Sequence, residues 1–397
     1  MSFPLDRRQA LQAAAVLPLA ASARAAGAND RIELGVIGCG GRGRWIADLF
    51  QAGGARIVAL HDYFQDRVDA AGEKLKVPPA RRYVGLDGYK QMLDSKLDGV
   101  VIESPPYFHP EQTVASLAKN KHVYLAKPIA VDAPGALAIA EAAEKVQDRL
   151  CCWVDFQTRV DPFYLGAAKR LFEGMIGKPF LVQACYLTGR LGAQAKPGSE
   201  QARLRNWVFD KALSGDILVE QNIHALDVTN WFLRGHPLKA SGTGGRKVRT
   251  DVGDCWDHFS LTFWYPDDVL VSFCSKQAGH GAEDIGVKVF CERGTVESHY
   301  GGLTEIRGQN GGYPGGASPG IYRDGAVRNI RLFLDAIAAG KPINNARESA
   351  NSTLTCILGR TAAYTGRTIT WDEMIKAGER LDARLHLPAD GPKWKAS

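Results

Sequence analysis

The sequence predicts an α/β protein of two domains, in which a doubly wound parallel sheet is followed by a second domain with its own sheet. A length of 397 residues exceeds a typical single domain, and 45% hydrophobic with 23% charged residues is an ordinary globular balance. Apolar strand-like runs alternate with helix-like runs to about residue 150, which is typical of a parallel sheet. From about residue 151 apolar residues alternate with a period of two, as in a half-buried sheet.

The stretch 32–62 has the pattern strand, glycine turn, helix, strand. Its turn has the form G-x-G-x-x-G and consists of Gly38, Cys39, Gly40, Gly41, Arg42 and Gly43. The first glycine permits a tight turn, the second lets a pyrophosphate approach the backbone, and the third lets helix and strand pack closely. A phosphate would lie at the helix N-terminus, where backbone N–H groups favour an anion. The stretch therefore predicts a Rossmann domain that binds a dinucleotide.

The second strand of this stretch ends at Asp62, which lies 19 residues after Gly43. A carboxylate at this distance hydrogen-bonds the hydroxyls of the adenosine ribose and repels a 2′-phosphate. The cofactor expected is therefore NAD, with NADP less favoured. Glycine turns also occur for packing alone. Here the strand before the turn, the helix after it and the position of Asp62 together favour a nucleotide-binding site.

Further ligand-binding residues are expected at the ends of two later strands. A strand over 98–104 is followed by prolines and His109, and a strand over 122–126 is followed by Lys127. Ligands of doubly wound sheets bind beyond the carboxyl ends of the strands. The predicted cofactor-binding residues are therefore the six residues of the turn, Asp62, Ser104, Pro105, His109 and Lys127.

A predicted helix over 217–232 places ionisable residues on an apolar background. At about 100° per residue, Glu220, His224 and Asp227 fall within roughly 60° of one another. Carboxylates on adjacent turns would fix the tautomer of His224 and raise its pKa, which suits a general base near neutral pH. A structural His–carboxylate pair is the alternative, but Lys127 and the glycine turn favour the catalytic interpretation.

The segment 188–215 is a long irregular stretch that is expected to be functional or mobile. Trp207 in this segment can stack on a sugar face or pack within the loop. Outside the segment, Arg159 can hold a substrate hydroxyl or carboxylate, or form a surface salt bridge. Six glycines and two prolines over 308–320 predict a flexible surface loop.

Residues 1–25 are predicted to be a targeting segment. Arg7-Arg8 precede an Ala/Leu-rich run over 10–21, and Ala-x-Ala sites follow it. The paired arginines resemble a twin-arginine signal; a general secretory signal and an uncleaved tail are the alternatives. Twin-arginine substrates fold before export, so NAD can be loaded first. A periplasmic or otherwise exported enzyme would then have to regenerate its own cofactor.

Charge and cysteine spacing exclude other classes of protein. The net charge is +6, of which residues 1–25 contribute +2, and the remaining +4 is too small to indicate a nucleic-acid partner. The apolar run over 10–21 is too short for a stable membrane anchor, so no membrane partner is expected after signal removal. The eight cysteines show no CxxC pair and no zinc-type spacing, which predicts no metal site.

Several motifs together resemble the Gfo/Idh/MocA family, to which glucose-fructose oxidoreductase and inositol dehydrogenase belong. They are the glycine turn, SPPYFHPE, HVYLAKP, SGDILVEQNIHALDVTNW, GVKVFCERGTVES, RNIRLFLDAIAAGKPI and GRTITWDEM, spread over residues 30–375. The resemblance implies a Rossmann domain over 30–150 and an α+β domain over 151–375 with an open, mostly antiparallel sheet, leaving 376–397 as a tail. A sugar or polyol would bind between the domains, and pairing of open sheets would give a homo-dimer or homo-tetramer.

The resemblance also implies residue roles. Lys127 matches the lysine of the family's Glu-Lys-Pro motif, which contacts the reacting hydroxyl and the nicotinamide region, and His224 matches the usual base. Three positions depart from the family pattern: Ala126 stands where glutamate is usual, Glu220 where aspartate is usual, and Asn222 where glycine is common.

The function predicted is an NAD-dependent carbohydrate oxidoreductase that transfers a hydride from a sugar or glycoside hydroxyl to a tightly bound cofactor, with internal recycling. The predicted catalytic residues are Lys127, His224 and Glu220. The predicted substrate contacts are Lys127, Arg159, Trp207, Asp227 and His224. Two alternatives stay open. One is an NAD-dependent glycoside hydrolase that acts by transient C3 oxidation, elimination and water addition, and the other is a non-catalytic sugar-binding protein.

Overall fold

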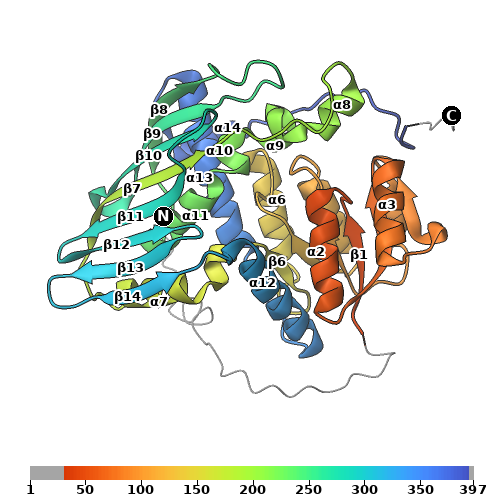
Figure 1. Cartoon of the computed structure of the whole chain (residues 1–397), viewed down its shortest axis with the longest axis horizontal. Helices are drawn as coiled ribbons and strands as arrows, with labels where there is room; N and C mark the ends of the chain where they lie inside the picture. The colour runs from red at the N-terminus through yellow and green to blue at the C-terminus, as the bar shows by residue number, and fades with distance from the viewer. Residues whose placement is uncertain (1–30, 393–397) are drawn as a thin grey trace.

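The structure is a computed structural model that describes residues 31–392. The predicted targeting segment 1–25 lies outside the described residues, so export stays a prediction. Figure 1 shows two sheets with helices packed between them and around the first sheet. The predicted fold class, a doubly wound parallel sheet followed by an open, mostly antiparallel sheet, is confirmed.

The first sheet has six parallel strands in the order β3-β2-β1-β4-β5-β6. The strands are β1 Glu33–Ile37, β2 Arg56–Asp62, β3 Arg82–Val84, β4 Gly99–Ile102, β5 His122–Leu125 and β6 Cys152–Val154. The helices of this domain are α2 Gly41–Ala52, α3 Gln65–Leu75, α4 Gly88–Leu93, α5 His109–Ala118 and α6 Ala133–Glu144, with the short 3₁₀ helix η1 Pro79–Arg81. The strand order reverses between β1 and β4, and such sheets bind dinucleotides at this point.

The central strands of this sheet are apolar because both faces are covered. Val36 and Ile37 of β1, like Val100 and Ile102 of β4, are at most 1% exposed. Strands buried on both faces have continuous apolar sequences rather than alternating ones. This burial fixes the carboxyl ends of β1 and β4, from which the glycine turn and Ser104 follow.

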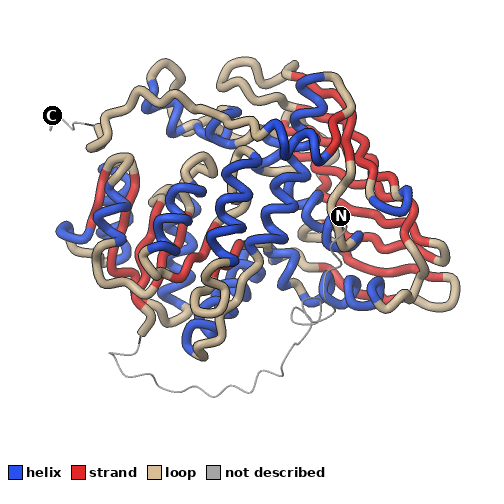
Figure 2. The backbone as a smooth tube through the Cα atoms, turned by 180° about the vertical axis from the view of Figure 1, so that it is seen from behind, coloured by secondary structure: helices blue, strands red, loops and turns tan. Residues whose placement is uncertain are grey.

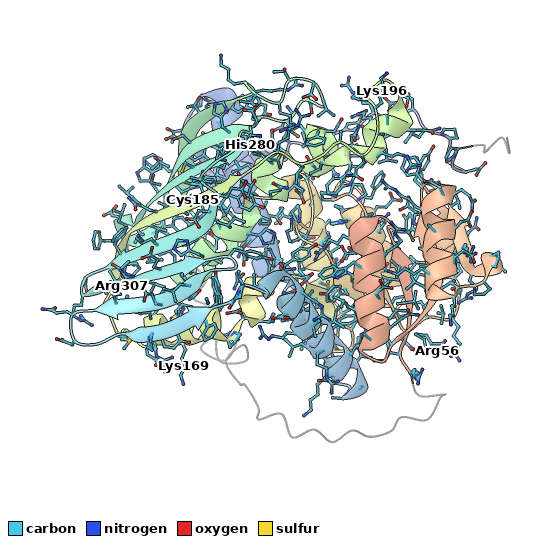
Figure 3. All side chains as sticks on the ribbon, in the orientation of Figure 1. Arg56, Lys169, Cys185, Lys196, His280 and Arg307 are labelled. Atoms are coloured by element: carbon cyan, nitrogen blue, oxygen red, sulfur yellow. The ribbon has the colours of Figure 1, made fainter. Side chains whose placement is uncertain are left out.

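The second sheet has nine strands in the order β14-β13-β12-β11-β7-β10-β9-β8-β15, and only the neighbours β7 and β10 run parallel. The strands are β7 Pro179–Thr188, β8 Lys239–Gly245, β9 His258–Trp264, β10 Leu270–Gln277, β11 Asp284–Cys291, β12 Gly294–His299, β13 Leu303–Gly308, β14 Tyr313–Ala317 and β15 Ile369–Thr370. The long helices α7 Pro162–Phe172, α11 Ile223–Leu233 and α13 Ala346–Thr365 pack on one face. In the part of the chain that the structure describes, no helix covers the other face (Figures 1 and 2). Figure 3 labels Cys185 of β7 and Arg307 of β13 among the side chains of this sheet.

Short helices occupy the connections of the second domain. They are η2 Gln157–Val160, α8 Glu200–Arg205, η3 Trp207–Phe209, α9 Lys211–Ser214, α10 Ile217–Glu220 and η4 Pro266–Asp268. Four of them divide the segment between β7 and α11, so the stretch predicted to be irregular contains helical turns.

The segment 308–320 is not the flexible loop that its glycines predicted. Tyr313–Ala317 form β14, which pairs with β13 at the edge of the second sheet. Gly315 has φ +52°, and an ideal Cβ there would lie 1.6 Å from the carbonyl oxygen of Thr304. Glycine in a strand often marks such a close backbone approach.

Two C-terminal segments return to the first domain. The helix α12 Ile321–Ala338 packs on α2, where Ile330 and Phe333 share a core cluster with Phe50. Trp153 of β6 donates its indole N–H to Asn329 of α12 at 2.8 Å. Strand β6 follows residue 150, where the first domain was predicted to end, and the division at that residue stays a prediction.

The tail after α14 Trp371–Ala377 also packs on the first domain, where Figure 2 shows it crossing above the parallel sheet. The Leu381 N–H donates to Asp132 Oδ2 at 3.0 Å, and the Leu86 N–H donates to the carbonyl oxygen of Ala389 at 2.7 Å. Ala383 is buried in a cluster that also contains Phe64. The tail therefore adds a layer beside the carboxyl edge of the first sheet.

Between residues 31 and 392, no helix combines the length and the apolar character needed to cross a membrane. Over the same range, no group of three or more histidine, cysteine, aspartate or glutamate side chains is placed to hold a metal ion.

Candidate active site

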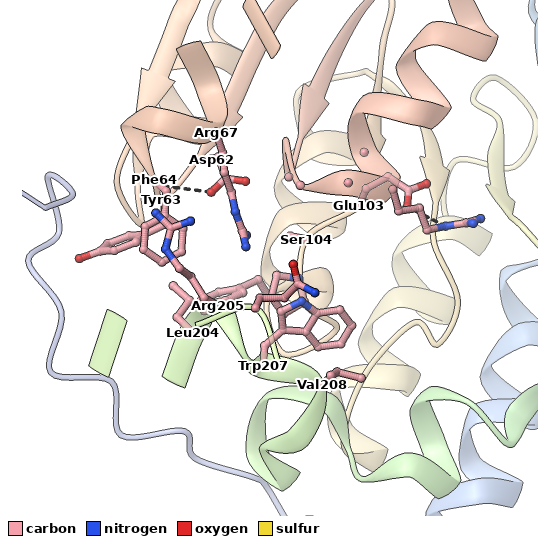
Figure 4. A pocket seen from close by; sticks show the side chains of 18 of the residues that line it. Asp62, Tyr63, Phe64, Arg67, Glu103, Ser104, Leu204, Arg205, Trp207 and Val208 are labelled. Atoms are coloured by element: carbon pink, nitrogen blue, oxygen red, sulfur yellow. Dashed lines mark hydrogen bonds and ion pairs between the residues drawn. The ribbon is translucent and has the colours of Figure 1, made fainter. Parts of the chain in front are cut away.

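A cavity of about 420 Å³ lies at the carboxyl edge of the first sheet, between the two domains (Figure 4). The residues predicted from sequence that line it are Gly38, Gly40, Gly41, Arg42, Gly43, Asp62, Ser104, Pro105, Trp207 and Glu220. The predicted residues outside its lining are Cys39, His109, Lys127, Arg159, His224 and Asp227. The glycine turn, Asp62 and the residues that follow β4 therefore line the same cavity.

The glycine turn has the shape that a dinucleotide requires. Gly38 has φ +95°, and a Cβ there would lie 2.5 Å from the carbonyl carbon of Glu103. A Cβ on Gly43 would lie 1.8 Å from the carbonyl oxygen of Gly38. By contrast, a Cβ on Gly41 would have no other atom of the described chain within 4 Å. The turn is thus closed toward the protein and open toward the cavity at the N-terminus of α2, where a diphosphate fits.

Asp62 is held at the end of β2 by backbone donors. Its Oδ2 accepts the N–H of Cys39 at 2.8 Å, and its Oδ1 accepts the N–H of Phe64 at 3.0 Å. Each carboxylate oxygen can accept a further hydrogen bond. The carboxylate lines the cavity with this capacity free, so it fits the ribose hydroxyls of NAD.

His109 connects two of the strand ends and does not reach the cavity. Its Nε2 lies 2.8 Å from the carbonyl oxygen of Ser104, and its Nδ1 lies 2.8 Å from that of Pro128. The ring is 1% exposed. His109 therefore fixes the Ser104 turn relative to the Lys127-Pro128 turn, while Ser104 itself faces the cavity.

Lys127 is held by a residue of the other domain. Its Nζ donates to the backbone carbonyl of Glu220 at 2.5 Å and to Glu220 Oε1 at 3.1 Å. Both side chains are almost buried, at 13% and 12% exposure. Residue 126 is alanine and offers no carboxylate, so Glu220 is the charged partner of Lys127 in this chain.

The helix predicted over 217–232 is interrupted, which corrects the predicted polar stripe. Helix α10 ends at Glu220 and α11 begins at Ile223. Between them the Asn222 N–H donates to the carbonyl oxygen of Ile217, five residues back, which makes one wide turn. Glu220 consequently faces Lys127 rather than lying beside His224 on one helical face.

The prediction that carboxylates raise the pKa of His224 is wrong. Burial lowers the pKa of His224 well below its ordinary value, and the positive charges of Lys127 and Arg42 lower it further. The ring packs between Tyr186, at 6.5 Å between ring centres, and Tyr300, at 5.3 Å. His224 is therefore neutral at neutral pH, which leaves it able to accept a proton.

Asp227 and Arg159 bind each other. Arg159 donates from Nε and Nη2 to the two carboxylate oxygens of Asp227, each at 2.8 Å, and Ser352 donates to Asp227 Oδ1 at 2.7 Å. Asp227 is fully buried, and the Arg159 guanidinium lies 4.9 Å from the ring centre of Trp231. The pair braces α11 against η2, so the Asp227 carboxylate is bound to Arg159 and Ser352 and forms no hydrogen bond with His224, three residues before it on α11.

Trp207 lies in the dinucleotide cavity. It packs against a cluster that contains Phe64 of the first domain and Leu204 of the second. Figure 4 shows its indole below Ser104. The structure thus places Trp207 beside the predicted cofactor site, whereas the sequence suggested a sugar or the loop itself as its partner.

The largest feature that sequence reasoning missed is a buried charge cluster around Arg42. Arg42 Nε lies 3.1 Å from Glu103 Oε2, its Nη2 lies 2.5 Å from Asp155 Oδ2, and its Nη1 donates to the Tyr322 hydroxyl at 3.0 Å. Burial raises the pKa of Glu103 to about 7, although Arg42 opposes the shift. The Arg42 side chain therefore links β4, β6 and α12, and only its backbone belongs to the nucleotide turn.

Glu103 and Asp155 directly follow β4 and β6, so the rule that identified Ser104 and Lys127 would also have found them. No sequence signal identifies Tyr186 or Tyr300, because they approach His224 only through the pairing of distant strands.

A parallel sheet with a glycine-lined cavity, an acid at the end of its second strand and a lysine near a neutral histidine is typical of the class of nicotinamide-dinucleotide oxidoreductases. Comparisons with known proteins agree. The model of the oxidoreductase family with an NAD-binding Rossmann fold matches residues 32–156, and that of the GFO/IDH/MocA C-terminal domain matches residues 164–297.

Individual relatives give the same result. Inositol 2-dehydrogenase of Acidothermus cellulolyticus is 29% identical over 276 residues, covering 68% of this chain and 73% of that protein. A levoglucosan dehydrogenase in complex with NADH and levoglucosan has a TM-score of 0.71 at 17% identity, covering 86% of this chain and 99% of that chain. An aldose-aldose oxidoreductase from Caulobacter crescentus, complexed with glycerol, has a TM-score of 0.70 at 18% identity with the same coverage.

The chain belongs to the Gfo/Idh/MocA family of oxidoreductases. It is an enzyme of this family, and its cofactor is NAD.

Two glycines of the turn should respond differently to alanine. Gly43→Ala should cost at least about 3 kcal/mol of unfolding free energy, because the new Cβ would overlap the Gly38 carbonyl. Gly40→Ala should leave stability unchanged, because its Cβ would meet only Arg67, at 3.8 Å. It should weaken NAD binding about tenfold or more, since the methyl group would occupy space for the pyrophosphate. Urea denaturation and NADH fluorescence titration measure the two effects, and equal behaviour of the variants would contradict this account of the turn.

Glu103 should make stability depend on pH. Folding raises the pKa of Glu103 from 4.5 to about 7, so the fold loses stability as pH rises between these values and loses no more above them. Glu103→Gln removes this titration, so its unfolding free energy relative to wild type should rise by about 2 kcal/mol from pH 5 to pH 8. Urea denaturation across this range tests it. The exposed control Glu141→Gln should keep a constant offset, and a constant offset for Glu103→Gln would refute the assignment.

Proposed function

We propose that the protein oxidises a hydroxyl group of a sugar or polyol, using NAD held in the cavity between the domains. The observation that supports this most directly is the position of Lys127, an ammonium group fixed by Glu220 beside a neutral histidine. An alcohol that loses a hydride needs a base for its proton and a positive charge near its oxygen. Lys127 and His224 supply these two groups.

Each residue has one task in this proposal. NAD, when bound, supplies the hydride acceptor. His224 takes the hydroxyl proton, for which its lowered pKa keeps it unprotonated before reaction. Lys127 donates a hydrogen bond to the substrate oxygen and stabilises its developing negative charge. Glu220 holds the ammonium group in position, and its Oε2 has no partner among residues 31–392, so it can accept a second substrate hydroxyl.

The substrate class rests on polar groups around the helix break and on the relatives. The amide oxygen and amide nitrogen of the Asn222 side chain and the Nδ1 of His224 are buried without a hydrogen-bond partner in the described chain. Buried polar atoms in proteins are nearly always hydrogen-bonded, so these groups suit a ligand with several hydroxyls. The relatives act on inositol, levoglucosan and aldoses according to their names. Nothing in the site favours glycoside hydrolysis over simple oxidation.

We also propose that NAD is retained through turnover and that a second sugar returns the hydride. The cluster of Phe64, Leu204 and Ala383 supports retention, because it joins the first domain, the second domain and the tail beside the cavity. The twin-arginine-like segment supports it as well, since an exported enzyme has little free NAD to exchange. The uncovered face of the nine-stranded sheet is the surface through which we propose that the protein forms a homo-dimer or homo-tetramer.

Replacing Lys127 should separate chemistry from cofactor binding. Lys127→Met should lower kcat/KM at least about 100-fold, because the charge beside the substrate oxygen is lost. NAD affinity should change less than about threefold, because Lys127 does not line the dinucleotide cavity. The measurements are NADH formation at 340 nm with myo-inositol, levoglucosan and glucose, and NADH fluorescence titration.

Lys119→Met is the matched control, since Lys119 is an exposed lysine that pairs with Asp94 on the surface of the same domain. This control should keep wild-type kcat/KM. Full turnover by Lys127→Met would rule out the role proposed for Lys127, and loss of NAD binding would mean that the lysine is part of the cofactor site instead.

A further inference from the structure

A second, basic pocket adjoins the dinucleotide cavity. It has a volume of about 270 Å³ and shares Gly40 and Gly41 of the turn with the larger cavity. Three arginines line it, namely Arg44, Arg67 and Arg205, and Asp66 is the one acidic side chain in the lining. The pocket is therefore positively charged where the glycine turn is open.

The three arginines come from different elements. Arg44 is in the first turn of α2 and Arg67 in the first turn of α3, while Arg205 ends α8 of the second domain. All three are half-buried. In Figure 4 the Arg67 side chain extends from beside Asp62 into the space between that residue and the second domain. The arginine side chains of α2, α3 and the second domain thus meet in one pocket.

Arg205 has an ion-pair partner in the protein, whereas Arg44 and Arg67 have none in the described chain. The Arg67 guanidinium carbon also lies near Phe64, at 5.0 Å from the ring centre. Arg205 Nη2 lies 2.7 Å from Asp66 Oδ1, and its guanidinium carbon lies 3.9 Å from the ring centre of Phe64. The side chains of Arg44 and Arg67 form no ion pair or hydrogen bond with any residue between 31 and 392. The closest approach to the turn is made by Arg67, whose Nη1 lies 3.8 Å from an ideal Cβ on Gly40.

Arg44 and Arg67 are half-buried cations without an ion-pair partner in the described chain, and they lie next to a helix N-terminus that favours an anion. We propose that Arg67 and Arg44 bind the diphosphate of NAD, and that Arg205 closes the pocket from the second domain. The usual glycine turn binds the diphosphate through backbone N–H groups and the helix end. Here guanidinium groups would add charge-assisted hydrogen bonds, for which arginine geometry is well suited.

The Arg205–Asp66 ion pair gives this site a second property. Asp66 is one residue from Arg67, so the contact ties α8 to the same turn of α3 that presents the Arg67 guanidinium. When NAD is bound, the second domain would therefore close over the diphosphate through Arg205. This extends the retention of NAD suggested above, although diphosphate binding does not depend on the identity of the substrate.

ADP-ribose and adenosine test the proposal, because ADP-ribose contains the diphosphate and a second ribose that adenosine lacks, and neither ligand contains nicotinamide. Calorimetric titration of nucleotide-free, full-length protein should show at least tenfold weaker ADP-ribose binding in Arg67→Gln and in Arg44→Gln. Arg67→Lys should recover part of the affinity, and adenosine binding should be unchanged in all variants. Added salt should weaken ADP-ribose binding less in Arg67→Gln than in wild type.

The matched control is Arg331→Gln, which removes an exposed arginine that pairs with Asp335 on α12 and should bind ADP-ribose like wild type. The proposal is overturned if the double variant Arg44→Gln/Arg67→Gln binds ADP-ribose like wild type, or if it loses adenosine to the same extent. It is also overturned if the arginines matter only for NADP, which would assign the pocket to a 2′-phosphate. A sugar-oxidation defect with normal ADP-ribose binding would count against the proposed function alone.

Discussion

Lys127 lies at the end of a first-domain strand, yet its ammonium group is held by Glu220 of the second domain. The contact forms only when the two domains are correctly placed against each other. The wide turn at Asn222 directs the carbonyl and the carboxylate of Glu220 toward the lysine. Leaving either charge alone at this depth would cost about 3–5 kcal/mol, so the pair also holds the domains together. Residue 126 is alanine, and the carboxylate that pairs with Lys127 comes from Glu220 of the second domain.

A second buried cluster of charged side chains, separate from the Lys127–Glu220 pair, consists of Arg42, Glu103 and Asp155. Arg42 pairs with Glu103 and Asp155 beneath the glycine turn, and its positive charge, like that of Lys127, lowers the pKa of His224. This field keeps His224 unprotonated at neutral pH, and it also makes the ring a weaker base than a free histidine. The same residues thus connect the architecture with the chemistry: the carboxyl ends of β4 and β6 position the charges, and the charges set the state of the base.

Local patterns predicted the parts of the site that depend on contiguous sequence. The glycine turn, Asp62 and Lys127 follow from the order of strands and helices, since the carboxyl ends of parallel strands meet at one edge. The pKa of His224 was mispredicted, because helical periodicity cannot show a wide turn and because Tyr186 and Tyr300 reach the ring from distant strands. Pairing between side chains that are far apart in the sequence, which joins Asp227 to Arg159 and Glu220 to Lys127, likewise leaves no periodic signal.

In the proposed reaction, bound NAD takes a hydride from a carbohydrate carbon. The most direct test is a single turnover with carbon-deuterated myo-inositol and glucose, followed by denaturation and mass spectrometry of the released nucleotide. We expect NAD-derived nucleotide with one deuterium, formed by the wild-type protein on at least one of these substrates or a close analogue. Release of NADP, or of NADH without deuterium while the substrate is oxidised, would contradict the account.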